Sequence, residues 1–221
     1  MSETGDSQQE KIGILGGTFD PPHIGHLLLG EIAREALGLS RVLFLPAGQP
    51  PHKVEEHISA PGHRLTMVEL AIGDNDCFVA DTVDMRRPPP HYTSTLFPLL
   101  RSRFTQAELW LLIGGDSLED LATWHDPHRI VADWRLGVLP RPGSAPDLVA
   151  LEKQVPGVQQ ATVMLEGPSV DVSSTEIRRW MTEGRSLRYV VPRSVREYAS
   201  THRLYGARRQ NYSALSSEPV S

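Results

Sequence analysis

The chain has 221 residues, of which 39% are hydrophobic and 22% charged, a balance typical of one globular α/β domain and too apolar for a disordered chain. A net charge of −5 provides no overall basic field for holding nucleic acid, so any phosphate binding has to be local. The single cysteine, Cys77, excludes intrachain disulfides, and no apolar run approaches the roughly 20 residues of a membrane helix. We therefore expect a soluble, cytoplasmic protein that binds neither nucleic acid nor membrane, with homo-oligomer formation left open.

The first predicted element is a buried strand at residues 11–15, an apolar run that ends at Gly16-Gly17. A helix follows, with Gly38 where a left-handed C-terminal cap belongs. Its apolar side chains recur with the helical period, at Leu29, Ile32, Ala33, Ala36 and Leu37. Residues 41–45 form a second strand. This strand–helix–strand unit predicts a parallel sheet.

Further strands are predicted at 109–113, 135–139 and 161–165, and helices at about 63–74, 94–103 and 116–132. Alternating strands and helices favour an α/β fold with a doubly wound parallel sheet. We expect one domain over residues 11–206, with disordered tails at 1–10 and 207–221. Long loops rich in proline and glycine at 46–62, 86–92 and 140–147 are candidate substrate walls.

The first motif lies between the first strand and the first helix and reads Gly-Gly-Thr-Phe-Asp-Pro-Pro-His-Ile-Gly-His over residues 16–26. Open α/β sheets bind ligands at this crevice, and a helix that starts near Gly25 directs unpaired N–H groups toward an anion there. His23 and His26 are three residues apart, so both can reach one phosphate, which would raise the pKa of each imidazole. A proline-rich turn with two solvated histidines is the alternative, but the flanking glycines, strand and helix favour a phosphate site.

The second motif lies late in the chain, where Ser173 and Glu176 have the spacing of a capping box before a helix closed by Gly184. Capping boxes are usually only structural. Ser174 and Thr175, however, add hydroxyls beside free amides, and Arg178 adds a guanidinium one turn further on. Together with the first motif, this helix start predicts a second phosphate contact in the same pocket.

Several other residues have both a functional and a structural interpretation. His52 and Lys53, after the second strand, suit a substrate phosphate or a solvated loop. Asp116 follows the strand 109–113 and can accept hydrogen bonds from ribose or cap a helix. Trp124 is more often a core residue than a ligand platform, and Arg141 is by default a surface residue that can supply charge near the site.

Gly-Gly-Thr-Phe-Asp-Pro followed by His-x-Gly-His resembles the adenylyltransferases of the nucleotidyltransferase superfamily, most closely the bacterial nicotinate mononucleotide adenylyltransferase family. The second motif is similar to a Ser-Ser-Thr-x-x-Arg segment that contacts the triphosphate in that family. The resemblance covers residues 11 to about 205. His-Ile-Gly-His also resembles class I aminoacyl-tRNA synthetases, but those are much longer, and the sequence has no Lys-Met-Ser-Lys-Ser segment.

The resemblance implies a Rossmann-like nucleotidyltransferase that joins AMP from ATP to nicotinate mononucleotide. It implies that His26 and His23 act at the α-phosphate, with the larger role for His26. It implies ATP contacts from Gly16, Gly17, Thr18, Phe19, Gly25, Ser174, Thr175 and Arg178. Mononucleotide contacts are expected from His52, Lys53, Tyr92, Thr93, Asp116, Trp124 and Arg141, with Trp124 stacking on the pyridinium ring.

One segment departs from the family pattern. The pattern Tyr-Thr-x-x-Thr-Leu is one residue shorter here, as Tyr92-Thr93-Ser94-Thr95-Leu96. A deletion of one residue rotates a following helix by about 100° unless something compensates. The choice between nicotinate and nicotinamide mononucleotide therefore stays open.

We predict no metal ion bound by the protein alone, because the run His125-Asp126-x-His128 lacks a companion ligand cluster. Mg²⁺ is expected mainly on the ATP phosphates, since it keeps its waters and takes few protein ligands. Two other functions stay open. One is adenylyl transfer to nicotinamide mononucleotide or phosphopantetheine, and the other is a nucleotide-binding regulator without turnover.

Overall fold

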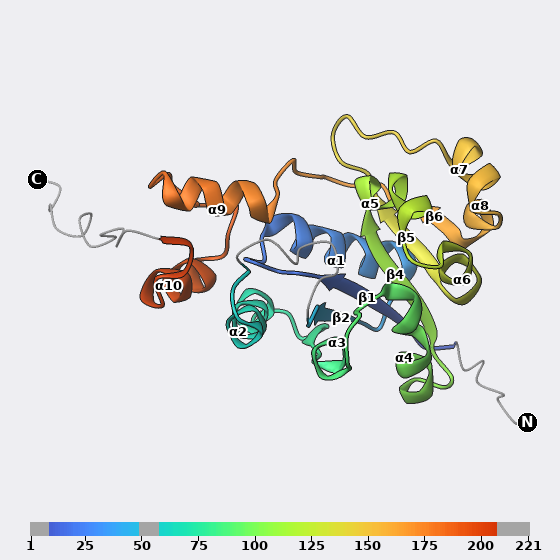
Figure 1. The fold of residues 1–221 in the computed structure, drawn as a ribbon, viewed down its shortest axis with the longest axis horizontal. Helices are drawn as coiled ribbons and strands as arrows, with labels where there is room; N and C mark the ends of the chain where they lie inside the picture. Colours follow the sequence, from blue (N-terminus) through green and yellow to red (C-terminus); the bar gives the residue numbers. More distant parts are fainter. Residues whose placement is uncertain (1–8, 49–57, 207–221) are drawn as a thin grey trace, which may run out of the picture.

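The structure is a computed structural model that describes residues 9–48 and 58–206. Its described part contains a parallel sheet in the order β3-β2-β1-β4-β5-β6 (Figure 1). The strands are β1 (Lys11–Gly17), β2 (Arg41–Pro46), β3 (Phe78–Ala80), β4 (Glu108–Gly114), β5 (Arg135–Leu139) and β6 (Thr162–Met164). The chain winds outward from β1 in one direction and from β4 in the other. This order confirms the predicted doubly wound sheet and places the reversal between β1 and β4.

The register of the central strands aligns their carboxyl ends. Ile12 of β1 lies opposite Arg41 of β2 on one side and Leu109 of β4 on the other. At the far end of β1, Gly17 pairs with Pro46. The loops that follow β1, β2 and β4 therefore leave the same edge of the sheet, which is where open α/β sheets bind ligands.

Both faces of the sheet are covered, and the strand side chains alternate between two apolar clusters. Leu15, Val42 and Phe44 pack on one face against helices that include α1 (Ile24–Leu37), α2 (Pro61–Ile72), α9 (Ser174–Thr182) and α10 (Arg193–Thr201). Ile12, Ile14 and Leu43 pack on the other face. The helices there include α4 (Phe97–Arg103), α6 (Pro127–Asp133), α7 (Leu148–Gln154) and α8 (Val158–Ala161). In Figure 1, α9 and α10 lie at the end of the molecule opposite α7 and α8.

The short elements are α3 (Val83–Arg86), α5 (Gly115–Glu119) and the 3₁₀ turns η2 (Thr93–Thr95), η3 (Leu121–Thr123) and η4 (Leu204–Gly206). Elements β3, α3, α7, α8 and α10 have no counterpart among the elements predicted from the sequence. The predicted strand 161–165 is shorter, because residues 158–161 are helical. No helix in the described ranges is long and apolar enough to cross a membrane.

The helix predicted at 116–132 is wrong. Three pieces occupy this region: α5, η3 and α6. Trp124 is extended, and Asp126 adopts a left-handed conformation with φ 52° just before Pro127. Proline disfavours a helical conformation at the residue before it, so α6 has to begin anew at Pro127. The helices predicted at 63–74 and 94–103 are present as α2 and as η2 followed by α4.

Two predicted helix ends are confirmed. Gly38 ends α1 with φ 65°, and its N–H donates to the carbonyls of Arg34 and Glu35. Ser173 caps α9 by accepting a hydrogen bond from the Glu176 N–H at 3.1 Å. Of the tail expected at 1–10, Glu10 lies within the described residues and pairs with Arg41 at 2.5 Å. Residues 1–8 and the tail expected at 207–221 lie outside the described residues.

Candidate active site

Residues 18–23 form a turn that joins β1 to α1 at the point where the strand order reverses. We call this segment the phosphate turn. Phe19 within it has φ 51°, a conformation that non-glycine residues seldom adopt, and its side chain is 1% exposed. The Phe19 ring meets the His26 ring edge-on at 4.9 Å between centroids. Burial of this ring thus keeps the turn in an unusual conformation beside His26.

The two histidines of the motif lie against each other at the start of α1. Their ring centroids are 3.7 Å apart. His23 is the N-cap residue, and its backbone N–H donates to Nδ1 of His26 at 3.2 Å. Because Nδ1 of His26 accepts this hydrogen bond, the neutral ring carries its proton on Nε2. The helix start therefore fixes the tautomer of His26 as well as its place.

Both imidazoles are neutral in the protein alone. Burial lowers the pKa of His23 to about 3, and the positive charge of Arg141 acts in the same direction. Burial, then His23, then Arg141 lower the pKa of His26 well below its usual range. A bound phosphate would oppose these shifts, because an anion favours the charged imidazole. In the protein without a bound phosphate, each ring therefore offers a neutral N–H donor.

The start of α9 contacts the phosphate turn directly. The Ser174 hydroxyl donates to the carbonyl of Pro21 at 2.9 Å. Nη1 of Arg178 donates to the carbonyl of Asp20 at 3.0 Å, and its Nη2 donates to Oγ1 of Thr175 at 3.2 Å. The structure therefore brings together the two motifs that are about 150 residues apart in the sequence.

Two cavities adjoin at the carboxyl edge of the sheet. The first, of about 320 Å³, is lined among others by Gly17, Thr18, Tyr92 and Thr93. The second, of about 180 Å³, is lined among others by His23, Gly25, His26, Asp116 and Arg141. Both cavities share a wall made by Gly16, Leu112, Ile113, Ser117 and Trp124. A ligand with two linked parts can therefore lie across Gly16 with one part in each cavity.

Asp116 and Arg141 line the cavity of the histidines rather than the one that contains Tyr92. Asp116 lies in the first turn of α5, and Nη2 of Arg141 is 3.5 Å from its Oδ2. At Gly114, just before α5, an added Cβ would lie 2.5 Å from Oδ1 of Asp116, so a larger residue there would displace this carboxylate. Contact of both residues with the mononucleotide stays a prediction, and the structure places them in the same cavity as His23 and His26.

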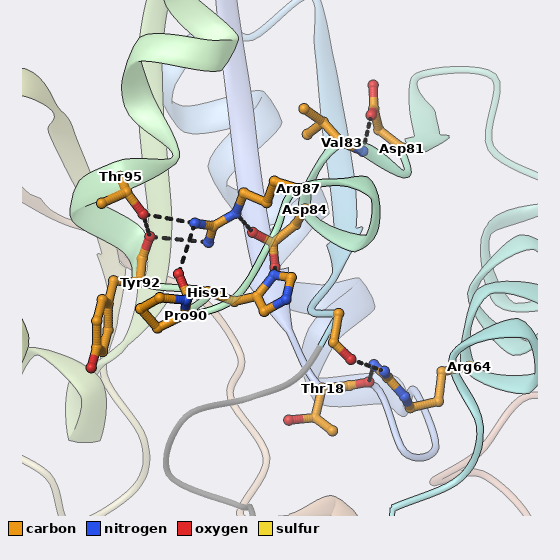
Figure 2. Close-up of polar contacts among 11 residues, drawn as sticks. Thr18, Arg64, Asp81, Val83, Asp84, Arg87, Pro90, His91, Tyr92 and Thr95 are labelled. Atoms are coloured by element: carbon orange, nitrogen blue, oxygen red, sulfur yellow. Dashed lines mark hydrogen bonds and ion pairs between the residues drawn. The ribbon is translucent and has the colours of Figure 1, made fainter.

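An ion-paired arginine holds the segment around Tyr92 in place (Figure 2). Nε of Arg87 lies 2.5 Å from Oδ1 of Asp84, and its Nη2 donates to the carbonyl of Tyr92 at 3.0 Å. Nη1 of Arg87 donates to Oγ1 of Thr95 at 2.7 Å. The Tyr92 ring stacks on His125 at 4.1 Å between centroids. The shortened segment thus forms the 3₁₀ turn η2, anchored at both ends, before α4 begins.

Arg64 of α2 is a structural residue of the site that the sequence analysis missed. Its side chain is 1% exposed and donates to the carbonyls of Thr18 at 2.9 Å, Gly48 at 2.9 Å and Ser59 at 3.1 Å (Figure 2 shows the contact with Thr18). Burial lowers the pKa of this guanidinium. A buried arginine whose partners are backbone carbonyls leaves no pattern in a sequence. Asp84, Arg87, His91, Ser117 and His125 also line the first cavity and were not predicted to do so.

His52 and Lys53 lie outside the described residues, so their predicted contacts stay a prediction. Within residues 9–48 and 58–206, no group of three or more His, Cys, Asp or Glu side chains is placed to hold a metal ion. The polar side chains that line the second cavity are two imidazoles, two serine hydroxyls, one carboxylate and one guanidinium. This set suits a phosphate and its associated cation better than a cation bound by the protein alone.

The cytidylyltransferase-like family model matches residues 14–180, a span that includes both motifs. Probable nicotinate-nucleotide adenylyltransferases are similar in sequence: that of Thermomicrobium roseum is 48% identical, covering 88% of this chain and 91% of the relative. That of Roseiflexus sp. is 43% identical, covering 88% of this chain and 97% of the relative.

Solved structures share the fold. Plasmodium falciparum nicotinic acid mononucleotide adenylyltransferase complexed with NaAD has a TM-score of 0.75 at 15% identity, covering 90% of this chain and 98% of that one. A putative nicotinate-nucleotide adenylyltransferase from Vibrio parahaemolyticus has a TM-score of 0.62 at 19% identity, covering 89% and 95%. Fold and site thus define a nucleotidyltransferase of the cytidylyltransferase-like class. Within that class, the chain belongs to the nicotinate-nucleotide adenylyltransferase family.

Proposed function

We propose that this protein transfers the adenylyl group of ATP to the phosphate of nicotinate mononucleotide, giving deamido-NAD and pyrophosphate. The observation that carries the proposal is the pair of cavities that adjoin at Gly16, with two neutral imidazoles lining one of them, their ring centroids 3.7 Å apart. A dinucleotide product has two nucleotide halves, and the sequence relatives are nicotinate-nucleotide adenylyltransferases. Our proposal assigns one half to each side of Gly16.

On the ATP side, we assign the triphosphate to the starts of α1 and α9. Backbone amides of Gly16, Gly17, Thr18 and Phe19 and the close approach allowed by Gly25 suit phosphate oxygens. Ser174, Thr175 and Arg178 add hydroxyls and a guanidinium fork from α9. His23 and His26 donate to the α-phosphate, whose charge grows during transfer.

On the mononucleotide side, we assign the pyridine ring to Trp124, since a cationic ring over indole contributes about 1 kcal/mol. Tyr92 and Thr93, held by Arg87, form the end of the cavity that would receive the nicotinate carboxylate. Asp116 and Arg141 would contact the parts of the substrate nearest the histidines. His52 and Lys53 remain the proposed contacts for the mononucleotide phosphate.

The reaction needs no protein nucleophile. A phosphate oxygen of the mononucleotide attacks the α-phosphorus of ATP, the bond to the bridging oxygen breaks, and pyrophosphate leaves with that electron pair. Most of the catalysis then comes from positioning and charge stabilisation by His23, His26 and Arg178. Mg²⁺ on the nucleotide would neutralise the charge of the departing pyrophosphate. The lone cysteine is compatible with work in the reducing cytoplasm.

Pyrophosphate release tests the proposal. The purified protein with ATP and Mg²⁺ is assayed separately with nicotinate mononucleotide, nicotinamide mononucleotide and phosphopantetheine. We expect turnover with the nicotinate form and at least about tenfold lower kcat/KM with the nicotinamide form. Equal rates with both pyridine substrates would contradict the acid preference. ATP binding without pyrophosphate release from any substrate would instead indicate a regulatory protein.

A further inference from the structure

Asp20, in the middle of the phosphate turn, is fully buried and has a hydrogen-bond donor at each carboxylate oxygen. Its side chain is 0% exposed. Oδ2 accepts a hydrogen bond from the Ser59 N–H at 3.0 Å, and Oδ1 accepts one from the Tyr205 hydroxyl. The backbone of the same residue accepts the hydrogen bond from Arg178 at 3.0 Å. A buried carboxylate is costly unless it is hydrogen-bonded, so these contacts determine where the turn lies.

Tyr205 reaches Asp20 from the far end of the described chain, 185 residues away, in the turn η4 after α10. Burial, followed by the charge of Asp20, raises the pKa of the Tyr205 phenol, so it stays protonated and donates at neutral pH. Its backbone has φ 61°, a left-handed conformation that is unfavourable for a non-glycine residue. The contacts of the side chain with Asp20 and Met67 offset this cost.

The geometry connects this hydrogen bond to the histidines. Asp20 is three residues before His23 and directly follows Phe19, whose ring packs on His26. We propose that Tyr205 is a positioning residue for adenylyl transfer, which acts through Asp20 to hold the phosphate turn against the imidazoles of His23 and His26. This inference rests on the proposed function. Tyr205 does not line either cavity, so it would change the geometry of catalysis without contacting substrate.

Tyr205→Phe tests the proposal, because it removes the hydroxyl and keeps the ring. Tyr198→Phe is the matched control: its hydroxyl also makes a partly buried contact, 2.8 Å from Nδ1 of His63, and both tyrosines pack on the same apolar cluster. We expect Tyr205→Phe to lower kcat by about tenfold to a hundredfold, since small displacements at a reacting centre have effects of this size. We expect Tyr198→Phe to keep kcat within about twofold, with a similar fall in Tm.

A second variant and a second readout keep the test independent of folding. Asp20→Asn should lower kcat in the same way, because its NH2 group replaces one of the two acceptor oxygens that face the Ser59 N–H and the Tyr205 hydroxyl. The double variant should be no worse than the more affected single variant, because both substitutions act on the contacts of the same carboxyl group. Ring-nitrogen NMR shifts of His23 and His26 should move in Tyr205→Phe and stay fixed in Tyr198→Phe.

The possible failures are distinguishable. An inactive wild-type protein would overturn the proposed function. If the wild type is active, two results would overturn the role of Tyr205 alone. One is an unchanged kcat with unchanged histidine shifts in Tyr205→Phe, and the other is an equal loss of kcat in both tyrosine variants. Additive effects of Tyr205→Phe and Asp20→Asn would also overturn the inference.

Discussion

The hydroxyl of Ser174 donates to the carbonyl of Pro21 at 2.9 Å, across a separation of 153 residues. This contact joins the start of α9 to the turn before α1. Two helix starts therefore lie at one edge of the sheet, and both offer N–H groups to an anion.

His26→Ala should lower turnover by about tenfold to a thousandfold while the protein stays folded, because a neutral donor at the α-phosphate is lost. His128→Ala is a suitable control, since His128 is exposed on α6 and lines neither of the two adjoining cavities. Steady-state kcat and Tm measure the two effects separately. Near-wild-type kcat in His26→Ala would reject the role we assign to this residue.

Arg178→Lys should raise KM for ATP by about tenfold, because lysine cannot make the forked contacts of a guanidinium. Arg178 donates at once to Asp20 and Thr175, and lysine can replace at most one of these contacts at the same place. Arg179→Lys is the matched control, since Arg179 is exposed and pairs with Glu176 and Glu183 on the surface. Initial rates over a range of ATP concentrations should separate the two variants. Equal KM values would argue against a triphosphate at this helix start.

Gly16→Ala should impair substrate binding without impairing the fold. An added Cβ at Gly16 would have no protein atom within 4 Å, so it would extend into open space from the wall that both cavities share. Gly13→Ala is the opposite case, because its Cβ would lie 2.8 Å from Leu39 and 3.0 Å from Leu112 in the core. We expect higher KM and unchanged Tm for Gly16→Ala. Gly13→Ala should be destabilised by about 1 kcal/mol with nearly unchanged KM. The reverse pattern would contradict a ligand over Gly16.

The buried neutral state of His23 should make the free protein less stable in acid. Its pKa is about 3 in the folded protein and about 6.5 in an unfolded chain, so only the unfolded chain binds a proton between these values. The free energy of unfolding should therefore fall as pH decreases from about 6.5 to about 3, by an amount on the order of a few kcal/mol for this group. Asparagine at this N-cap does not titrate and caps well. Urea unfolding at several pH values should show a weaker pH dependence for His23→Asn, and an equal dependence would contradict a neutral buried His23.

The sequence predicts elements well where a local pattern determines them. The apolar run before Gly16 and the helical period that ends at Gly38 describe β1 and α1 closely. Strand β3 is only three residues long, too short for a pattern to stand out, and its place in the sheet depends on pairing with β2. The helix break near Asp126 is indicated by Pro127, whereas the apolar period alone predicts a continuous helix.

The same distinction between local patterns and distant contacts holds for the residues of the candidate site. Glycines and histidines that are close in the sequence can be found from their spacing, because the strand-to-helix turn fixes their neighbourhood. The contacts of Arg64 and Tyr205 with this neighbourhood cannot be found in this way, because their partners are a backbone carbonyl and a side chain that lie far away along the chain. Tertiary packing alone brings these groups together.

The distant anchors of the phosphate turn also bear on how the site arises during biosynthesis. The side chains that hold the turn come from residues 64, 174, 178 and 205. A nascent chain that has emerged only as far as β4 has the glycines and both histidines but lacks most of the groups that fix their geometry. Nucleotide recognition should therefore appear late in translation, and the same short segment transplanted into another scaffold should not recreate it.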